Sequence, residues 1–222
     1  MAIYVTSDAH GHVRALDEAL SKISLTSDDT LYVLGDMIDR GPDPVGVINL
    51  VRSLPNARVL KGNHEQIMLD AIIGQDPLDA ETWDINGGWT TRQQLNEMEF
   101  EAYEELVRWA AALPLYAVAE TAERPYLLVH AGIQAEAARS FLLEHGVDCA
   151  DGRGAVDANS ELLQQMLAVQ SSDDLLWIRH GYWDAPTGLL SVEGKGPVVV
   201  SGHTPTVSLG RYCEVGGLAG LD

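Results

Sequence analysis

The sequence predicts an α/β fold whose parallel β-strands deliver polar residues to one edge of a sheet. Two observations support this prediction. Short apolar runs alternate with segments of helical spacing, and five of these runs end in a polar cassette. The cassettes are Asp8-Ala9-His10, Gly35-Asp36-Met37-Ile38-Asp39-Arg40-Gly41, Gly62-Asn63-His64-Glu65, His130-Ala131-Gly132 and Gly202-His203-Thr204. With 222 residues and 46% hydrophobic content, the chain is long enough to form one domain spanning residues 1–222.

The first third of the chain is predicted to repeat a strand–loop–helix unit. Residues 2–6 form an apolar strand, and apolar residues recur at helical spacing over 13–23. A second strand over 30–34 leads into the second cassette, and a helix over 44–54 precedes a third strand over 57–61. Because parallel strands end at the same edge of a sheet, we expect the three cassettes after these strands to lie together.

The remaining elements follow the same reasoning. A loop is expected at 77–91, where Asn86, Gly87 and Gly88 interrupt any regular spacing, and another loop at 149–157. Helices are expected at 65–73, 93–113, 134–143 and 160–169, and strands at 115–119, 125–129 and 197–201. The last two strands deliver His130 and His203.

The composition excludes several classes of protein. A formal net charge of -19 repels phosphate backbones over most of the surface, which disfavours nucleic acid as a partner. The sequence contains neither a run of about 20 apolar residues nor a signal segment, so we expect a cytoplasmic protein without a membrane partner. The two cysteines lack a CxxC spacing and are expected to be free thiols.

The cassette residues are typical of a metal site. Carboxylate, imidazole and amide oxygen donors suit divalent ions, with manganese the first choice and iron or zinc the alternatives. If the backbone of the first cassette stays extended, its one-residue gap lets Asp8 and His10 project in the same direction. Two divalent ions would outweigh the carboxylates and a bridging hydroxide, so the site would attract phosphate locally. This favours metal-assisted hydrolysis of a phosphoester.

The order of the cassettes, the Gly-Asp-x-x-Asp-Arg-Gly form of residues 35–41 and the run Gly62-Asn63-His64-Glu65 resemble the metallophosphoesterase superfamily. Within it, the chain is most similar to the small bacterial and phage, lambda phosphatase-like members of the phosphoprotein phosphatase family. The resemblance spans most of the chain. It implies a calcineurin-like sandwich of two mixed β-sheets flanked by helices, holding two divalent metal ions.

The resemblance also implies a role for each cassette residue. Asp36 would bridge the two metals, and His64 would be the general acid, with Asp39 accepting a hydrogen bond from its other ring nitrogen. The metal ligands would be Asp8 and His10 for the first ion and Asn63, His130 and His203 for the second. The residues expected to contact the substrate phosphate are Arg40, Asn63 and Arg179, the last resembling an arginine that follows Leu-Trp in bacterial members.

After Thr204 and Pro205 the family usually continues into a strand carrying Asp-Thr-Gly and then a last strand. This chain offers residues 211–222 without that tripeptide, which puts the closing strand in doubt.

The activity that the resemblance implies is hydrolysis of phosphate monoesters on Ser or Thr, and on Tyr as a further substrate. A hydroxide bridging the metals would attack directly, and the substrates would be phosphoproteins, phosphopeptides and small aryl phosphates. Related enzymes that hydrolyse diadenosine tetraphosphate symmetrically share the metal cassettes and are the main alternative. Asp39 favours the phosphatase, because the matching position in those relatives is typically not Asp. An inactive module that binds phosphorylated partners is the third hypothesis.

Overall fold

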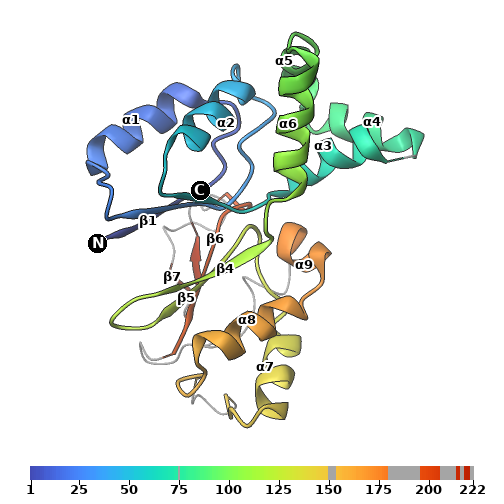
Figure 1. Cartoon of the computed structure of the whole chain (residues 1–222). Helices are drawn as coiled ribbons and strands as arrows, with labels where there is room; N and C mark the ends of the chain where they lie inside the picture. Colours follow the sequence, from blue (N-terminus) through green and yellow to red (C-terminus); the bar gives the residue numbers. More distant parts are fainter. Residues whose placement is uncertain (75, 150–153, 180–195, 206–213, 216–217, 221–222) are drawn as a thin grey trace. The chain divides into compact units, whose positions relative to one another are not determined.

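A computed structural model describes residues 1–74, 76–149, 154–179, 196–205, 214–215 and 218–220 (Figure 1). The chain divides into two compact units, Met1–Pro114 and Leu115–Asp222, and each is described by itself. Within the described residues, no helix is long and apolar enough to cross a membrane.

The first unit contains a parallel three-stranded sheet. Its strands are β1 (Ile3–Thr6), β2 (Thr30–Val33) and β3 (Ala57–Val59), in the order β1-β2-β3. The crossover helices α1 (Val13–Ile23) and α2 (Pro44–Ser53) pack against each other (Figure 1). Parallel strands need such crossovers, and the alternation predicted from the sequence is confirmed here.

Each crossover helix buries one face, and α2 begins with a side-chain cap. Leu16 of α1 is buried in the same core cluster as Val47, Ile48 and Val51 of α2. Pro44 occupies the first turn of α2, and the Asp43 side chain accepts a hydrogen bond from Gly46 N at 2.9 Å. Such a cap supplies a partner for a backbone N–H that has none inside the helix.

Four more helices complete the first unit: α3 (Asn63–Ile73), α4 (Pro77–Ile85), α5 (Trp89–Asn96) and α6 (Phe100–Ala111). The expectation of a loop over 77–91 is wrong, because α4 and the first turn of α5 occupy most of it. Asp76 caps α4 through Leu78 N, and Pro77 is preorganised for a first helical position. The irregular part is confined to residues 86–88, where Gly87 has a φ of 92°.

The second unit contains a mixed five-stranded sheet of order β4-β5-β6-β8-β7. The strands are β4 (Tyr116–Glu120), β5 (Pro125–Val129), β6 (Val198–Ser201), β7 (Glu214–Val215) and β8 (Leu218–Gly220). The helices are α7 (Ala135–Glu144), α8 (Ser160–Ala168) and α9 (Ser172–Trp177). A closing strand exists despite the missing tripeptide, since β8 pairs in parallel with β6.

The predicted fold class is confirmed: helices accompany two separate β-sheets. In detail, only the second sheet is mixed among the described strands, because β1, β2 and β3 all run parallel. Of the two cysteines, Cys149 is a free, buried thiol, and Cys213 lies outside the described residues.

Candidate active site

The loops that follow β1 and β2 run side by side and carry the first candidate residues. Backbone hydrogen bonds join Asp8 N to Gly35 O at 3.1 Å and His10 N to Asp36 O at 2.9 Å. The condition for a parallel pair of Asp8 and His10, an extended backbone, is not met, because these residues have φ values of 54° and 39°. Positive φ in a residue other than glycine costs about 1–3 kcal/mol and is concentrated at functional sites. Asp36, Asp39 and Arg40 share this conformation.

His10, Asp36 and His64 form a compact group of potential metal donors, whose ligand atoms all lie within 4.8 Å of one another. Asp36 Oδ2 lies 3.6 Å from His10 Nε2 and 3.9 Å from His64 Nε2. Nδ1 of His10 donates to the carbonyl of Ile38 at 2.8 Å, so the lone pair of Nε2 faces the group. Burial lowers the pKa of His10, which keeps the imidazole neutral, as metal ligation requires. The imidazole of His10 and the carboxylate of Asp36 are therefore donors of the kind that a divalent ion takes, with the His64 ring beside them.

The other two candidate ligands of this unit lie at strand ends. Asp8 follows β1 on the loop hydrogen-bonded to the Asp36 loop. Asn63 opens α3 directly after β3 and is buried. Both positions agree with the expected gathering of cassettes at the carboxyl edge of this parallel sheet.

The expected hydrogen bond between His64 and Asp39 is present, while their catalytic role stays a prediction. His64 Nδ1 donates to Asp39 Oδ2 at 2.7 Å, and both residues are 0% exposed. That bond directs the other ring nitrogen, Nε2, toward Asp36 and Arg40. A buried carboxylate in this position fixes the orientation of the imidazole.

Arg40 places its guanidinium beside both imidazoles. Nη1 lies 2.9 Å from His10 Nε2, and Nη2 lies 2.8 Å from His64 Nε2. The Arg40 backbone is fixed by a bond from its N–H to Gly87 O at 3.0 Å. A planar guanidinium held in this way can bind two phosphate oxygens at once.

Glu65 links the two loops around Asp36, a role that the sequence analysis did not assign. Its carboxylate accepts backbone N–H bonds from Asp36, Met37 and Gly62, each at 2.8 Å. Burial, followed by the charge of Asp36, raises the pKa of Glu65 to about 7 despite these three donors. A glutamate three residues after the helix cap is the pattern that would have identified this bond.

The second unit brings together three further candidates. The rings of His130 and His203 lie 5.0 Å apart between centroids, and both residues are buried. Gly202 N donates to His130 O at 2.9 Å, which ties together the two loops that follow β5 and β6. Arg179 Nη1 donates to Thr204 Oγ1 at 3.3 Å, so this arginine lies beside the His203 cassette. Its contact with a substrate phosphate stays a prediction. A pair of imidazoles is a suitable donor set for a divalent ion.

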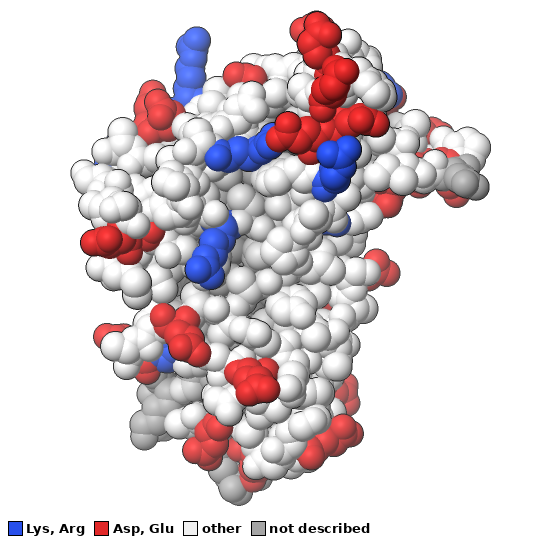
Figure 2. All heavy atoms as spheres, in the orientation of Figure 1, with Lys and Arg blue, Asp and Glu red and all other residues white. Residues whose placement is uncertain are grey.

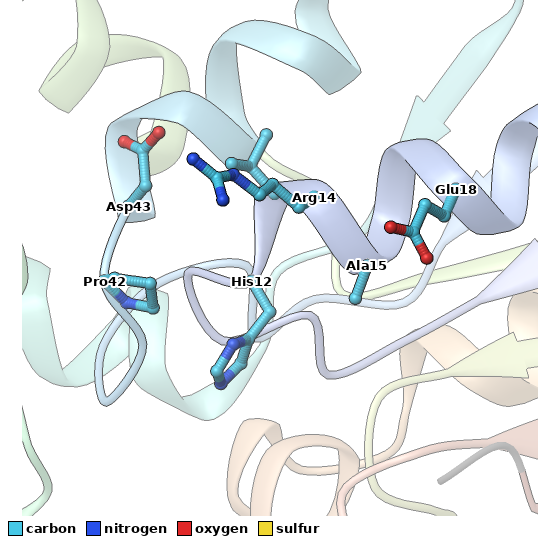
Figure 3. Close-up of a pocket in the computed structure, with 7 residues that line it drawn as sticks. His12, Arg14, Ala15, Glu18, Pro42 and Asp43 are labelled. Atoms are coloured by element: carbon cyan, nitrogen blue, oxygen red, sulfur yellow. The ribbon is translucent and has the colours of Figure 1, made fainter.

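A cavity of about 590 Å³ opens beside the loops that carry His10 and Arg40. Asp43 N donates to Gly11 O at 2.9 Å and thereby ties the two loops together at this point. Figure 3 shows Arg14 and Glu18 projecting from α1, with Pro42 and Asp43 on the loop that leads into α2. The full lining is His12, Val13, Arg14, Ala15, Glu18, Pro42 and Asp43.

Acidic side chains outnumber basic ones in the chain. Asp and Glu spread over the face seen in Figure 2, in keeping with 33 acidic and 14 basic residues in the chain. Arg40 is therefore a cation in a predominantly acidic protein. Its place beside His10 and His64 gives the donor group a positive charge that can attract an anion.

Sequence comparison identifies relatives of known description. Residues 1–217 match the family described as calcineurin-like phosphoesterase. A symmetrical bis(5'-nucleosyl)-tetraphosphatase of Proteus mirabilis (strain HI4320) is 32% identical over 220 residues, covering 96% of this chain and 68% of that protein. The enzyme of the same name from Erwinia tasmaniensis is 31% identical over 136 residues, covering 60% of this chain and 45% of the relative.

Two solved structures share the fold at low sequence identity. A candidate diadenosine tetraphosphatase aligns with a TM-score of 0.58 at 19% identity, covering 99% of this chain and 82% of the other. A cold-active protein tyrosine phosphatase aligns with a TM-score of 0.53 at 18% identity, covering 99% and 69%. The superfamily resemblance is confirmed. The finer assignment to the phosphoprotein phosphatases is not the one that the sequence relatives carry, because their names match the alternative hypothesis.

Proposed function

Because this chain belongs to the calcineurin-like phosphoesterase family, we propose that it is a metal-dependent phosphoester hydrolase whose first substrate is a symmetrical dinucleoside tetraphosphate. The observation that carries the hydrolase proposal is the buried pair of His64 and Asp39 beside the donor group of Asp36 and His10. The substrate is inferred from the two tetraphosphatases at 31% and 32% identity.

The metal ligands of the proposal are those that the family resemblance implies. His10 and Asp36, with Asp8, would hold one ion, and His130 and His203 would hold the other. It remains a prediction that Asp36 also bridges the two ions and that Asn63 is a ligand of the second ion. Two divalent ions at such a site polarise the phosphoryl group and activate water for in-line attack.

The side chains of the first unit would then bind the phosphoryl group and protonate the leaving oxygen. Arg40 binds two phosphoryl oxygens and neutralises charge that builds up on them. Once Arg40 binds the phosphoryl oxygens instead of His64 Nε2, that nitrogen is free to carry a proton, and His64, oriented by Asp39, would give this proton to the oxygen that leaves. With a symmetrical tetraphosphate, water would attack one of the two central phosphorus atoms, and the bond from that phosphorus to the oxygen bridging the two would break, which releases two nucleoside diphosphates.

The cavity beside Arg40 supports a substrate larger than a phosphate group. It has room for a nucleoside portion, and Pro42 and His12 offer flat faces on which a base can stack. Arg14 supplies a positive charge for a further phosphate. The carboxylates of Glu18 and Asp43 can accept hydrogen bonds from ribose hydroxyls or a base amine.

The test supplies the metal-stripped protein with Mn²⁺ and diadenosine tetraphosphate and identifies the products by anion exchange. ADP as the sole nucleotide product supports the proposal. AMP with ATP contradicts the symmetrical reaction. The His64→Asn variant, which should lose about 10²–10⁴-fold in kcat, controls for a contaminating enzyme.

A second candidate function is hydrolysis of phosphate monoesters on proteins, which the acid pair favours. Asp39 Oδ2 lies 2.7 Å from His64 Nδ1, and the family resemblance implies an Asp at this position for the phosphatases rather than for the tetraphosphatases. Phosphoserine and phosphotyrosine peptides tested beside the dinucleotide decide between the substrates through their kcat/KM values. Metal binding without turnover of any substrate would instead favour the inactive binding module.

A further inference from the structure

Asp39 has more partners than the imidazole that it orients. The indole Nε1 of Trp83 donates to Asp39 Oδ1 at 3.0 Å and to Oδ2 at 3.2 Å. The Thr91 hydroxyl donates to Oδ1 at 2.5 Å. Trp83 is 3% exposed and Thr91 is 0% exposed, so water does not compete strongly for these bonds.

The Thr91 hydroxyl both accepts a hydrogen bond from Asp39 and donates one to it. Its oxygen accepts the backbone N–H of Asp39 at 2.9 Å, while its O–H donates to the carboxylate of the same residue. One hydroxyl therefore fixes the main chain and the side chain of Asp39 together. This matters because Asp39 has a φ of 69°, a conformation that needs support from its surroundings.

The turn between α4 and α5 brings Trp83 and Thr91 to the same carboxylate. Gly88 N donates to Trp83 O at 2.9 Å, and a Cβ on Gly88 would lie 2.2 Å from the Trp83 ring. Gly87 O accepts the Arg40 N–H, which places this turn against the residue that follows Asp39. The two glycines thus allow the close approach.

We propose that Trp83 and Thr91 are positioning residues of the acid pair. They occupy Oδ1 of Asp39 and thereby hold Oδ2 toward Nδ1 of His64. Neither residue touches the substrate. This inference rests on the proposed hydrolase function, since it assigns to these residues the orientation of the group that protonates the leaving oxygen.

The chain offers a matched control at the neighbouring threonine. Thr90 is 7% exposed, and its hydroxyl has no hydrogen-bond partner within the part of the chain that the structure describes. Thr91→Val and Thr90→Val therefore make the same chemical change at adjacent buried positions, but only the first removes a bond to Asp39. Trp83→Phe keeps an aromatic ring and removes the N–H, and Thr91→Ser keeps the hydroxyl.

The experiment compares two aryl phosphates in the Mn²⁺-loaded protein. Phenyl phosphate has a leaving group that needs a proton, whereas p-nitrophenyl phosphate has one that is stable without it. Thr91→Val and Trp83→Phe should lower kcat for phenyl phosphate by about 10- to 100-fold, and clearly less for p-nitrophenyl phosphate. Thr90→Val should match the wild type, and Thr91→Ser should recover most of the loss.

An equal loss on both substrates would show a merely structural role and overturn the proposal, as would a Thr91→Val variant that behaves like Thr90→Val. Far-UV circular dichroism and thermal melting identify variants that fail to fold, in which case Thr91→Ser against Thr90→Val carries the comparison. A folded Thr91→Ser that loses phenyl phosphate activity as fully as His64→Asn would count against the hydroxyl.

A readout without turnover separates this proposal from the proposed function. The Nδ1 proton of His64 should resonate far downfield in the ¹H–¹⁵N spectrum, because it lies in a 2.7 Å bond to a carboxylate. Thr91→Val and Trp83→Phe should move that resonance, and Thr90→Val should not. If the wild type hydrolyses no phosphoester, the function fails while this shift still supports the positioning. An unmoved resonance overturns it.

Discussion

Arg40 shows at the scale of one residue why shape matters as well as charge. Its two terminal nitrogens lie 2.9 Å and 2.8 Å from the Nε2 atoms of His10 and His64. Lysine has the same charge but only one terminal nitrogen, so it cannot reproduce the fork.

We expect Arg40→Lys to lower kcat/KM for phosphoesters by about 10- to 100-fold, the loss of one charge-assisted hydrogen bond. Arg52→Lys is the matched control, because Arg52 pairs with Glu105 on the surface and packs over Trp109. Steady-state kinetics on one dinucleotide and one aryl phosphate measure the effect. Equal rates for Arg40→Lys and Arg52→Lys would remove Arg40 from the phosphate site.

Glu65 makes a different kind of contribution, because its carboxyl group titrates inside the protein. Burial and Asp36 raise its pKa from the ordinary 4.5 to about 7, so the folded protein holds the proton more tightly than the unfolded chain. The stability from this group is therefore complete below pH 4.5 and is lost as the pH rises through 7.

Glu65→Gln removes the titration while keeping the size of the side chain. In the metal-free protein, the free energy of unfolding of the wild type, minus that of Glu65→Gln, should decrease as the pH rises from about 4.5 to 7. Urea unfolding at a series of pH values measures this difference. If this difference, wild type minus variant, stays constant or increases with pH, the raised pKa is contradicted.

At the scale of elements, the approach of the β2 loop to the start of α3 depends on glycine. Gly35 has a φ of 96°, and a Cβ there would lie 2.3 Å from Gly62 N. The same approach allows Glu65, in the first turn of α3, to bind Asp36 N and Gly62 N. The distance between two elements is thus set by two residues without side chains.

Gly35→Ala should weaken the metal site as well as the fold, because it pushes the Asp36 loop away from α3. We expect a destabilisation larger than the roughly 1 kcal/mol that positive φ alone costs an alanine, together with weaker Mn²⁺ binding. Gly146→Ala is the control, since Gly146 has a φ of 85° with no atom within 4 Å of the added Cβ. Thermal melting and metal titration should separate the two variants. Equal effects would show that the close approach is unimportant.

The helices α4 and α5 show where sequence patterns fail at the same scale. Gly87, Gly88 and Asn86 suggested a loop over 77–91, yet only three residues interrupt the two helices. Trp83 of α4 is buried, and its N–H donates to Asp39. Hydrophobic periodicity predicts which side chains are buried, but it does not predict which polar atoms they hydrogen-bond in the interior.

For the whole molecule, metal binding and stability should be coupled. An ion that binds only the folded state at about 100 times its Kd adds about 2.7 kcal/mol to the free energy of unfolding. Two divalent ions would also offset part of the formal net charge of -19, which opposes the compact state.

Mn²⁺ should therefore raise the Tm of the metal-stripped protein, and EDTA should reverse the increase. Asp36→Asn removes a carboxylate of the donor group and should give a much smaller shift, while Asp76→Asn, at the cap of α4, should respond like the wild type. Calorimetry with and without the ion measures both. An unchanged Tm, or the same shift in Asp36→Asn as in the wild type, would argue against the metal site.

The sequence by itself determined the alternation of strands and helices and the strand ends that carry His10, Asp36, Asn63, His130 and His203. These follow from local periodicity and from short motifs whose residues are close along the chain. The pairing of His64 with Asp39, which lie 25 positions apart, was expected only from the family resemblance. Only the tertiary structure decided that Glu65 ties Asp36 to Gly62, and that Trp83 and Thr91 reach Asp39. These partners lie 29, 44 and 52 positions apart in the chain, and a hydrogen bond over such separations depends on packing that no local pattern encodes.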